Sequence, residues 1–262
     1  MISNERKKYL KKRKKEKIQI LFFQILILFL FIIIWELLSR FKIIDTFLLS
    51  SPSNILKTII KLYKSNNLFS HIFKTLDEII ISFVLGNIIG FIISSILWFN
   101  KKLSLILDPY LTIINSLPKV AFGPLIIILV GANTNSIIIM SLLISSIVSI
   151  LNMNTFFKNT DKNIIKIIKT MGGNKYDIFF RVVVPSNLNY ILDSFKVNIS
   201  MCFVGVIMGE FLVSKEGIGY LINYGSQIFN MNLVLTGIIL LVLLTIILYL
   251  IINLIIKKIK RY

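Results

Sequence analysis

The sequence has very few of the residues from which most active sites and metal sites are built. Its 262 residues include one cysteine, Cys202, one histidine, His71, and only twelve acidic residues. A lone cysteine excludes an intrachain disulfide, and a lone histidine without a cysteine partner does not make a zinc site. We therefore expect no catalytic residue, metal or cofactor, and we expect His71 to lie at the surface or at a membrane interface.

A nucleotide-binding motif is also missing. No G-x-x-x-x-G-K-[ST] pattern occurs in the chain, so it does not bind ATP through a P-loop. A membrane enzyme would need His, Cys or acidic residues clustered near an interface, and this composition disfavours that class.

Long apolar runs are abundant instead. Hydrophobic residues make up 56% of the chain, and the mean hydropathy is +0.83. A helix needs about 20 apolar residues to cross a bilayer. The sequence therefore predicts an all-α, polytopic transmembrane helix bundle with about six spans, at roughly 18–39, 76–99, 107–131, 134–156, 187–210 and 232–256.

The net charge of +18 reflects membrane topology rather than nucleic-acid binding, because the cations gather at the ends of the apolar runs. With the N-terminus inside, the inner segments hold 21 lysines and arginines and the outer segments hold 7. We expect a multi-pass protein of the cell (inner or plasma) membrane with both termini in the cytoplasm. Its parts are a basic cytoplasmic N-terminus (1–17), a retained first span (18–39), an outer segment (40–67), a transmembrane domain (68–256) with a cytoplasmic loop (157–187), and a cytoplasmic tail (257–262).

Two patterns outside that loop concern packing. Gly86 and Gly90 form a small-xxx-small pair, which permits close contact between helices. In the outer segment, Ile55, Ile59, Ile60 and Tyr63 predict an amphipathic helix on the membrane surface.

The loop at 157–187 contains the sequence MGGNKYDIFFRVVVP and predicts two short helices joined at glycines. Asp161 suits a helix N-terminus and Gly172 a C-terminal stop. Asn174, followed by Asp177, resembles a capping box for a second helix, which Pro185 would end or bend before the fifth span. The first helix carries an apolar face of Ile164, Ile167, Ile168 and Met171. Such a face binds either a partner protein or the lipid surface.

The spacing of Gly172, nine residues and Val182-Val183-Val184-Pro185 resembles the cytoplasmic loop of permease subunits of binding-protein-dependent ABC importers. That loop usually begins with Glu-Ala-Ala, where this chain has Lys166-Ile167-Ile168. The stretches WELLSR (35–40), LLSSPSNIL (48–56), DPYLTIINSLPKVAFGPLIIILVGA (108–132) and GEFLVSKEGIGYLI (209–222) are similar to nitrate, sulfonate and taurine importer permeases.

The resemblance implies a type I ABC importer permease fold and an ATP-driven importer whose ATPase is a separate chain. It implies coupling to that ATPase through Lys166, Ile167, Ile168, Met171, Gly172 and Pro185. The implied partners are cytoplasmic ABC ATPase subunits, an extracytoplasmic solute-binding protein, a second permease copy in a homodimer and the lipid bilayer. The implied substrate is a nitrate-, sulfonate- or taurine-like anion or a small vitamin precursor.

Charged residues, glycines and a proline within the spans or near the outer mouth are candidates for the translocation pathway or its gate. They are Pro118, Lys119, Glu210, Gly217 and Gly219. Lys119 either faces the pathway, where a cation favours an anionic substrate, or extends toward the cytoplasmic interface. Asp193 and Lys196 are three residues apart and are expected to form a local pair. The alternative function is an ion-coupled secondary transporter, a class that commonly shows inverted repeats, which this sequence does not display convincingly.

Overall fold

The computed structural model describes the backbone of residues 4–260 and the side chains of residue 9 and residues 12–260. The first residues of the basic N-terminus and the last two of the expected tail lie outside this range. All regular structure within it is helical. In chain order the elements are α1 (Asn4–Arg40), α2 (Thr46–Leu49), α3 (Pro52–Lys64), α4 (Asn67–Phe99), α5 (Lys101–Ser116), the 3₁₀ helix η1 (Lys119–Phe122), α6 (Gly123–Val130), α7 (Thr134–Lys158), α8 (Lys162–Thr170), α9 (Lys175–Ile178), the π-helical turn η2 (Phe179–Val183), α10 (Val184–Val213), α11 (Ile218–Gln227) and α12 (Met231–Ile259).

Five helical stretches in the described chain are long and apolar enough to cross a membrane, and a bent pair makes a sixth candidate. The span expected over 107–131 is not one continuous helix. The helix begins at Lys101, ends at Ser116, and is followed by η1 and α6 after an 87° bend. Pro118 explains the break, since it lacks an N–H and forces Leu117 into an extended conformation (φ −68°, ψ 144°).

The centre of the bundle is made by α4, α7 and α10, which pack closely because small residues face one another. A side chain on Gly86 would meet the Ser145 hydroxyl at 2.7 Å, and one on Gly90 would overlap Ser149. The same holds for Gly205, which lies against the backbone of Ser141. The small-xxx-small pair therefore serves helix packing, as the sequence predicted.

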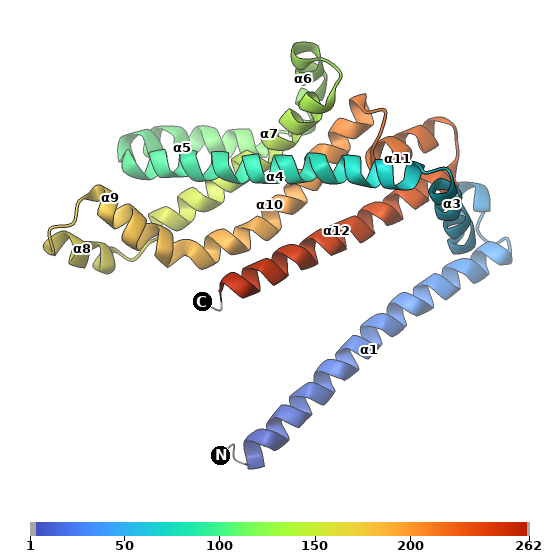
Figure 1. Cartoon of the computed structure of the whole chain (residues 1–262), viewed down its shortest axis with the longest axis horizontal. Coiled ribbons are helices and arrows are strands. Elements are labelled where there is room, and N and C mark those ends of the chain that lie inside the picture. Colours follow the sequence, from blue (N-terminus) through green and yellow to red (C-terminus); the bar gives the residue numbers. More distant parts are fainter. Residues whose placement is uncertain (1–3, 261–262) are drawn as a thin grey trace.

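Figure 1 shows that the molecule has two distinct ends along its long axis. At one end lie α8 and α9, and toward the other lie α3 and α11; the C-terminus and the start of α1 lie in the half nearer α8. We call these the α8 end and the α11 end. Helix α1 stands apart from the bundle over most of its length. Its 37 residues extend about 55 Å, which exceeds the roughly 30 Å hydrocarbon core of a bilayer.

Helix α3 differs from the expected surface helix. Ile55 is buried and Ile59 packs against the bundle core, whereas Ile60 and Tyr63 are more than half exposed. The buried edge lies against α12 and α4. The buried face of α3 is therefore narrower than the apolar face that the sequence predicted, because the neighbouring helices contact only one side of α3.

Candidate functional site

Helix α8 is a short helix with a defined start and a defined stop. The Asp161 carboxylate accepts a hydrogen bond from the Asn163 N–H at 2.8 Å and caps the N-terminus. At the other end, Gly173 N–H donates to the Ile168 carbonyl at 2.9 Å and Gly172 N–H to the Lys169 carbonyl at 3.0 Å. These two bonds are the Schellman motif, and its turning residue, Gly172, has φ +83°. The predicted glycine stop is confirmed.

The apolar face predicted for α8 is divided between two directions. Ile164, Ile167 and Met171 point away from the bundle, with 42%, 56% and 77% of their surfaces exposed. Ile168, which the sequence pattern grouped with them, instead packs with Ile165 against a buried core cluster. We call the three exposed residues the outward face. The prediction of one four-residue face was wrong because the bundle contacts one side of that stripe.

A second short helix follows the glycine turn and anchors α8 to the bundle. The Asn174 side chain accepts from Asp177 N–H at 2.9 Å, and the Asp177 carboxylate accepts from Asn174 N–H at 3.2 Å, so the predicted capping box is present. Phe179 is fully buried, with ring centroids 5.0 Å from those of Trp98 and Phe99 and 5.3 Å from that of Phe157.

Pro185 does not end this second helix. Helical structure continues from Lys175 through the π turn η2 into α10, and together they form a 39-residue candidate span. Pro185 follows directly on the π turn η2, in which the Val184 N–H donates to the Phe179 carbonyl five residues back, so the regular i→i−4 pattern is already interrupted where the proline lacks an N–H. The helix that contains the fifth expected span (187–210) therefore begins earlier, at Lys175, and Lys166 lies exposed on α8.

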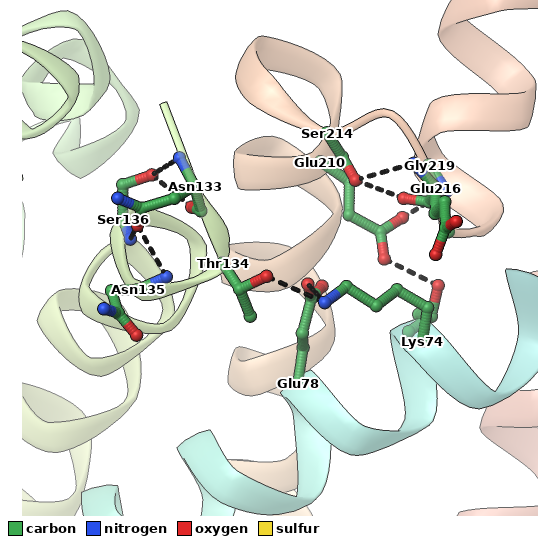
Figure 2. Close-up of polar contacts among 12 residues, drawn as sticks. Lys74, Glu78, Asn133, Thr134, Asn135, Ser136, Glu210, Ser214, Glu216 and Gly219 are labelled. Atoms are coloured by element: carbon green, nitrogen blue, oxygen red, sulfur yellow. Dashed lines mark hydrogen bonds and ion pairs between the residues drawn. The ribbon is translucent and has the colours of Figure 1, made fainter. Parts of the chain in front are cut away.

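At the α11 end, the side chain of Glu210 is fully buried and hydrogen-bonded. Its carboxylate accepts from the Thr75 hydroxyl at 2.6 Å and from the Gly219 N–H, as Figure 2 shows for Gly219. Thr75 in turn accepts from Ile218 N–H at 2.8 Å. Gly217 begins α11 with φ +111°, and a side chain there would overlap Glu210.

His71 completes this joint, and its expected place at a surface or interface is wrong. The side chain is 8% exposed, and its Nδ1 accepts from Gly217 N–H at 3.0 Å. Sequence reasoning missed the polar face of α4 that meets this joint. The face itself was detectable, because His71, Lys74, Thr75 and Glu78 recur at the i, i+3, i+4, i+7 spacing of one helical face, although their partners were not.

Beside this joint is a polar cavity of about 300 Å³, lined by residues from α4, the start of α7 and the turn after α10. The Lys74 ammonium donates to the Thr134 hydroxyl at 2.7 Å and lies 3.6 Å from the buried Glu78 carboxylate (Figure 2). In the same view, the Asn133 side-chain oxygen caps α7 by accepting hydrogen bonds from the backbone N–H groups of Asn135 and Ser136. The arrangement ties α4 to both α7 and the α10–α11 turn.

The remaining candidates lie away from this joint. Pro118 and Lys119 are at the break between α5 and η1, where the Lys119 ammonium donates to the backbone and side-chain oxygens of Asn115 at 2.9 and 3.1 Å. Asp193 pairs with Lys196 at 3.1 Å, as expected, and also with Lys260 at 2.7 Å. Among the described residues, no three His, Cys or acidic side chains gather as metal ligands.

The chain matches known proteins over most of its length. Residues 86–261 match the family of binding-protein-dependent transport system inner membrane components. It is 28% identical to a formylaminopyrimidine transport permease protein, ThiX, of Halalkalibacterium halodurans, covering 72% of this chain and 74% of that protein. It is 25% identical to a putative aliphatic sulfonates transport permease protein, SsuC, of Bacillus subtilis (80% and 76%), and to the riboflavin transport system permease protein RibX of Chloroflexus aurantiacus (83% and 81%).

A solved structure shares the fold. A chain of the MetNI methionine ABC transporter, in an inward-facing conformation, matches with a TM-score of 0.65 at 18% identity. The match covers 74% of this chain and 97% of that one.

Proposed function

Because the chain belongs to the family of binding-protein-dependent transport system inner membrane components, it is a membrane-spanning permease subunit of an ABC importer, and we propose how it couples to ATP hydrolysis. The outward face of α8 docks in a groove on a cytoplasmic ABC ATPase subunit, which hydrolyses the ATP. Movement of that ATPase is transmitted through α8 and α9 to α10. Both termini of the chain and α8 then lie in the cytoplasm.

The outward face is the observation that carries this proposal. Ile164, Ile167 and Met171 form an exposed apolar patch on a helix whose two ends are capped. Ile165 and Ile168 hold the opposite side of α8 against the bundle. A helix-in-groove contact uses this arrangement, in which apolar anchors at i, i+3 and i+7 enter a partner's groove.

Rigidity on the permease side favours a protein partner over a helix lying loosely on lipid. Phe179, directly after α9, is enclosed by aromatic rings from α4 and α7. A displacement of α8 is therefore transmitted to the bundle through packed side chains. Fully burying an isoleucine or methionine side chain contributes about 1.5–3 kcal/mol. The three side chains of the outward face are already partly buried, so their contact with the ATPase is worth a few kcal/mol and is reversible.

The test measures co-purification of the ATPase with three aspartate variants of α8: Ile167→Asp, Ile168→Asp and the control Lys169→Asp. Ile167→Asp places a charge in the proposed groove, and the permease should reach the membrane but lose the ATP-hydrolysing subunit on affinity purification. Lys169→Asp, on the opposite side of the same helix, should retain it. Ile168→Asp should instead destabilise the loop itself, because Ile168 packs inward. Equal retention of the ATPase by Ile167→Asp and Lys169→Asp contradicts the proposal.

We propose that the imported solute is either a sulfonate-like anion or a small heterocyclic vitamin precursor. The names of the relatives support this, since they refer to formylaminopyrimidine, aliphatic sulfonates and riboflavin. Uptake by proteoliposomes of three labelled probes, a formylaminopyrimidine, an aliphatic sulfonate and riboflavin, with the cognate binding protein, distinguishes them. Uptake of none of the three contradicts this substrate proposal.

We also propose that an extracytoplasmic solute-binding protein delivers the solute and that two copies of the permease enclose the pathway. The family description, which names a binding-protein-dependent system, supports the binding protein. The second copy is what the resemblance to ABC importer permeases implies. Native mass spectrometry of the purified complex should give two permease copies. The ion-coupled alternative is not favoured, because the family match and the fold match both concern ABC importers.

A further inference from the structure

A second cavity, of about 340 Å³, lies at the α8 end of the bundle where α4, α5, α7 and α8 meet. It sits between the last residues of two candidate spans, α4 and α7, and the first residues of α5 and α8. That position corresponds to the level of the lipid headgroups. The cavity is on the opposite side of α8 from the outward face, since Ile165 lines it.

The lining of this cavity is amphipathic. Its apolar part comes from Leu97, Trp98, Leu105, Phe157 and Ile165, and its polar part includes three lysines, Lys101, Lys158 and Lys162. Trp98 is a residue type that concentrates at membrane–water interfaces. The combination of an apolar wall and a cationic rim fits a molecule with an acyl chain and an anionic head.

Two of the three lysines have no acidic partner among the described residues. Lys158 pairs with the Asp108 carboxylate at 3.0 Å. Lys101 and Lys162 form no ion pair within residues 12–260, and both are exposed at the rim. The neighbouring Asp161 carboxylate is occupied in capping α8. The rim therefore has two cations available for a phosphate group.

A buried hydroxyl is the independent sign of a ligand. Ser104 lines the cavity and is 3% exposed, yet its Oγ has no hydrogen-bond partner in the described chain. Leaving a buried hydroxyl unpaired costs about as much as a lost hydrogen bond, so such groups usually have a partner or a bound molecule.

We propose that this cavity binds the headgroup of one anionic phospholipid, with Lys101 and Lys162 at the phosphate, Ser104 as a further hydrogen-bonding group, and an acyl chain along Leu105 and Trp98. Basic pockets between helices on the cytoplasmic side recognise such headgroups. Since Lys162 begins α8, the bound lipid ties the start of α8 to the α4–α5 turn. Any effect of this lipid on coupling to the ATPase rests on the proposed function. The binding of the lipid to the cavity does not depend on that function.

The binding test uses the purified full-length permease in detergent, with lipids retained on it counted by native mass spectrometry. Phosphatidylglycerol should be retained in preference to phosphatidylcholine. Each lysine near a membrane surface favours anionic lipid by about a factor of five, so Lys101→Gln combined with Lys162→Gln should weaken phosphatidylglycerol binding about 25-fold. The control is Lys102→Gln combined with Lys169→Gln, which removes the same charge from α5 and α8 outside the cavity.

Ser104 gives a second, independent variant. Ser104→Ala removes only the hydroxyl and should weaken phosphatidylglycerol binding several-fold while the protein elutes normally on size exclusion. Equal retention by the two double variants overturns the proposal, as does equal retention of phosphatidylcholine. Displacement of the lipid by excess inorganic phosphate overturns it too, because it would identify a site for soluble anions. The lipid measurement uses the permease without its ATPase. The result of the Ile167→Asp coupling test therefore has no bearing on it, and the two proposals can fail separately.

Discussion

Replacing Gly172 by valine is expected to loosen the turn after α8 while leaving the membrane-spanning helices intact. Gly172 has φ +83°, and no atom lies within 4 Å of the position that a Cβ would occupy. The valine side chain therefore has room, and steric overlap adds nothing to the free-energy cost of the substitution. The cost comes from the backbone conformation, in which a β-branched residue is strained by roughly 1–3 kcal/mol.

That energy acts on a local equilibrium between the closed turn and an open one. At about 1.4 kcal/mol per factor of ten, the open population should rise about 5- to 150-fold. The two Schellman bonds from Gly172 and Gly173 would break in the open form. Hydrogen exchange of their amides, measured by mass spectrometry on the purified complex, should therefore accelerate, and ATPase co-purification should fall.

Gly172→Asn is the matched control, because asparagine tolerates this left-handed conformation better than other side chains. It adds a side chain of similar size in the same open space. The valine variant should lose protection and coupling, whereas the asparagine variant should keep most of both. If the two variants exchange and couple alike, the turn geometry does not carry the effect and the reasoning from φ fails.

Further predictions concern topology, the buried joint and the break in the third span. In a Cys202→Ala background, a single cysteine at Lys175 should react with an impermeant reagent only from the cytoplasmic side; labelling from outside would reverse the proposed orientation. Glu210→Gln should lose one of two buried hydrogen bonds, worth about 1–3 kcal/mol, and melt below the exposed control Glu216→Gln in detergent; identical melting would show that the joint contributes no stability. Lys119→Met should reduce uptake more than membrane insertion; unchanged uptake at a normal protein level would limit this lysine to its contact with α5.

The features of the loop at 157–187 that the sequence predicted correctly are local ones. Asp161, Gly172 and Asn174 cap helices through bonds to residues two or three positions away, so their roles depend little on the rest of the fold. The division of the apolar stripe is not local. Ile167 and Ile168 are adjacent in sequence, and only the packing of the bundle decides which one is buried.

The same distinction explains the errors elsewhere. The bond between His71 and Gly217 joins residues 146 positions apart, and no pattern in either segment alone reveals the pairing. Pro118 stands in the third expected span, but a proline in a helix permits anything from a slight kink to a full break. The 87° angle depends on how η1 and α6 pack against α7. The number of spans was predictable from hydropathy because it depends on length and composition alone.

The energy source of transport tests the central claim most directly. The permease, its ATPase and its binding protein are reconstituted in proteoliposomes with ionophores that abolish ion gradients, and uptake of the labelled solute is measured with and without ATP. The account predicts ATP-dependent uptake that persists without ion gradients and is lost in Ile167→Asp but not in Lys169→Asp. Uptake that runs on an ion gradient without ATP would contradict it.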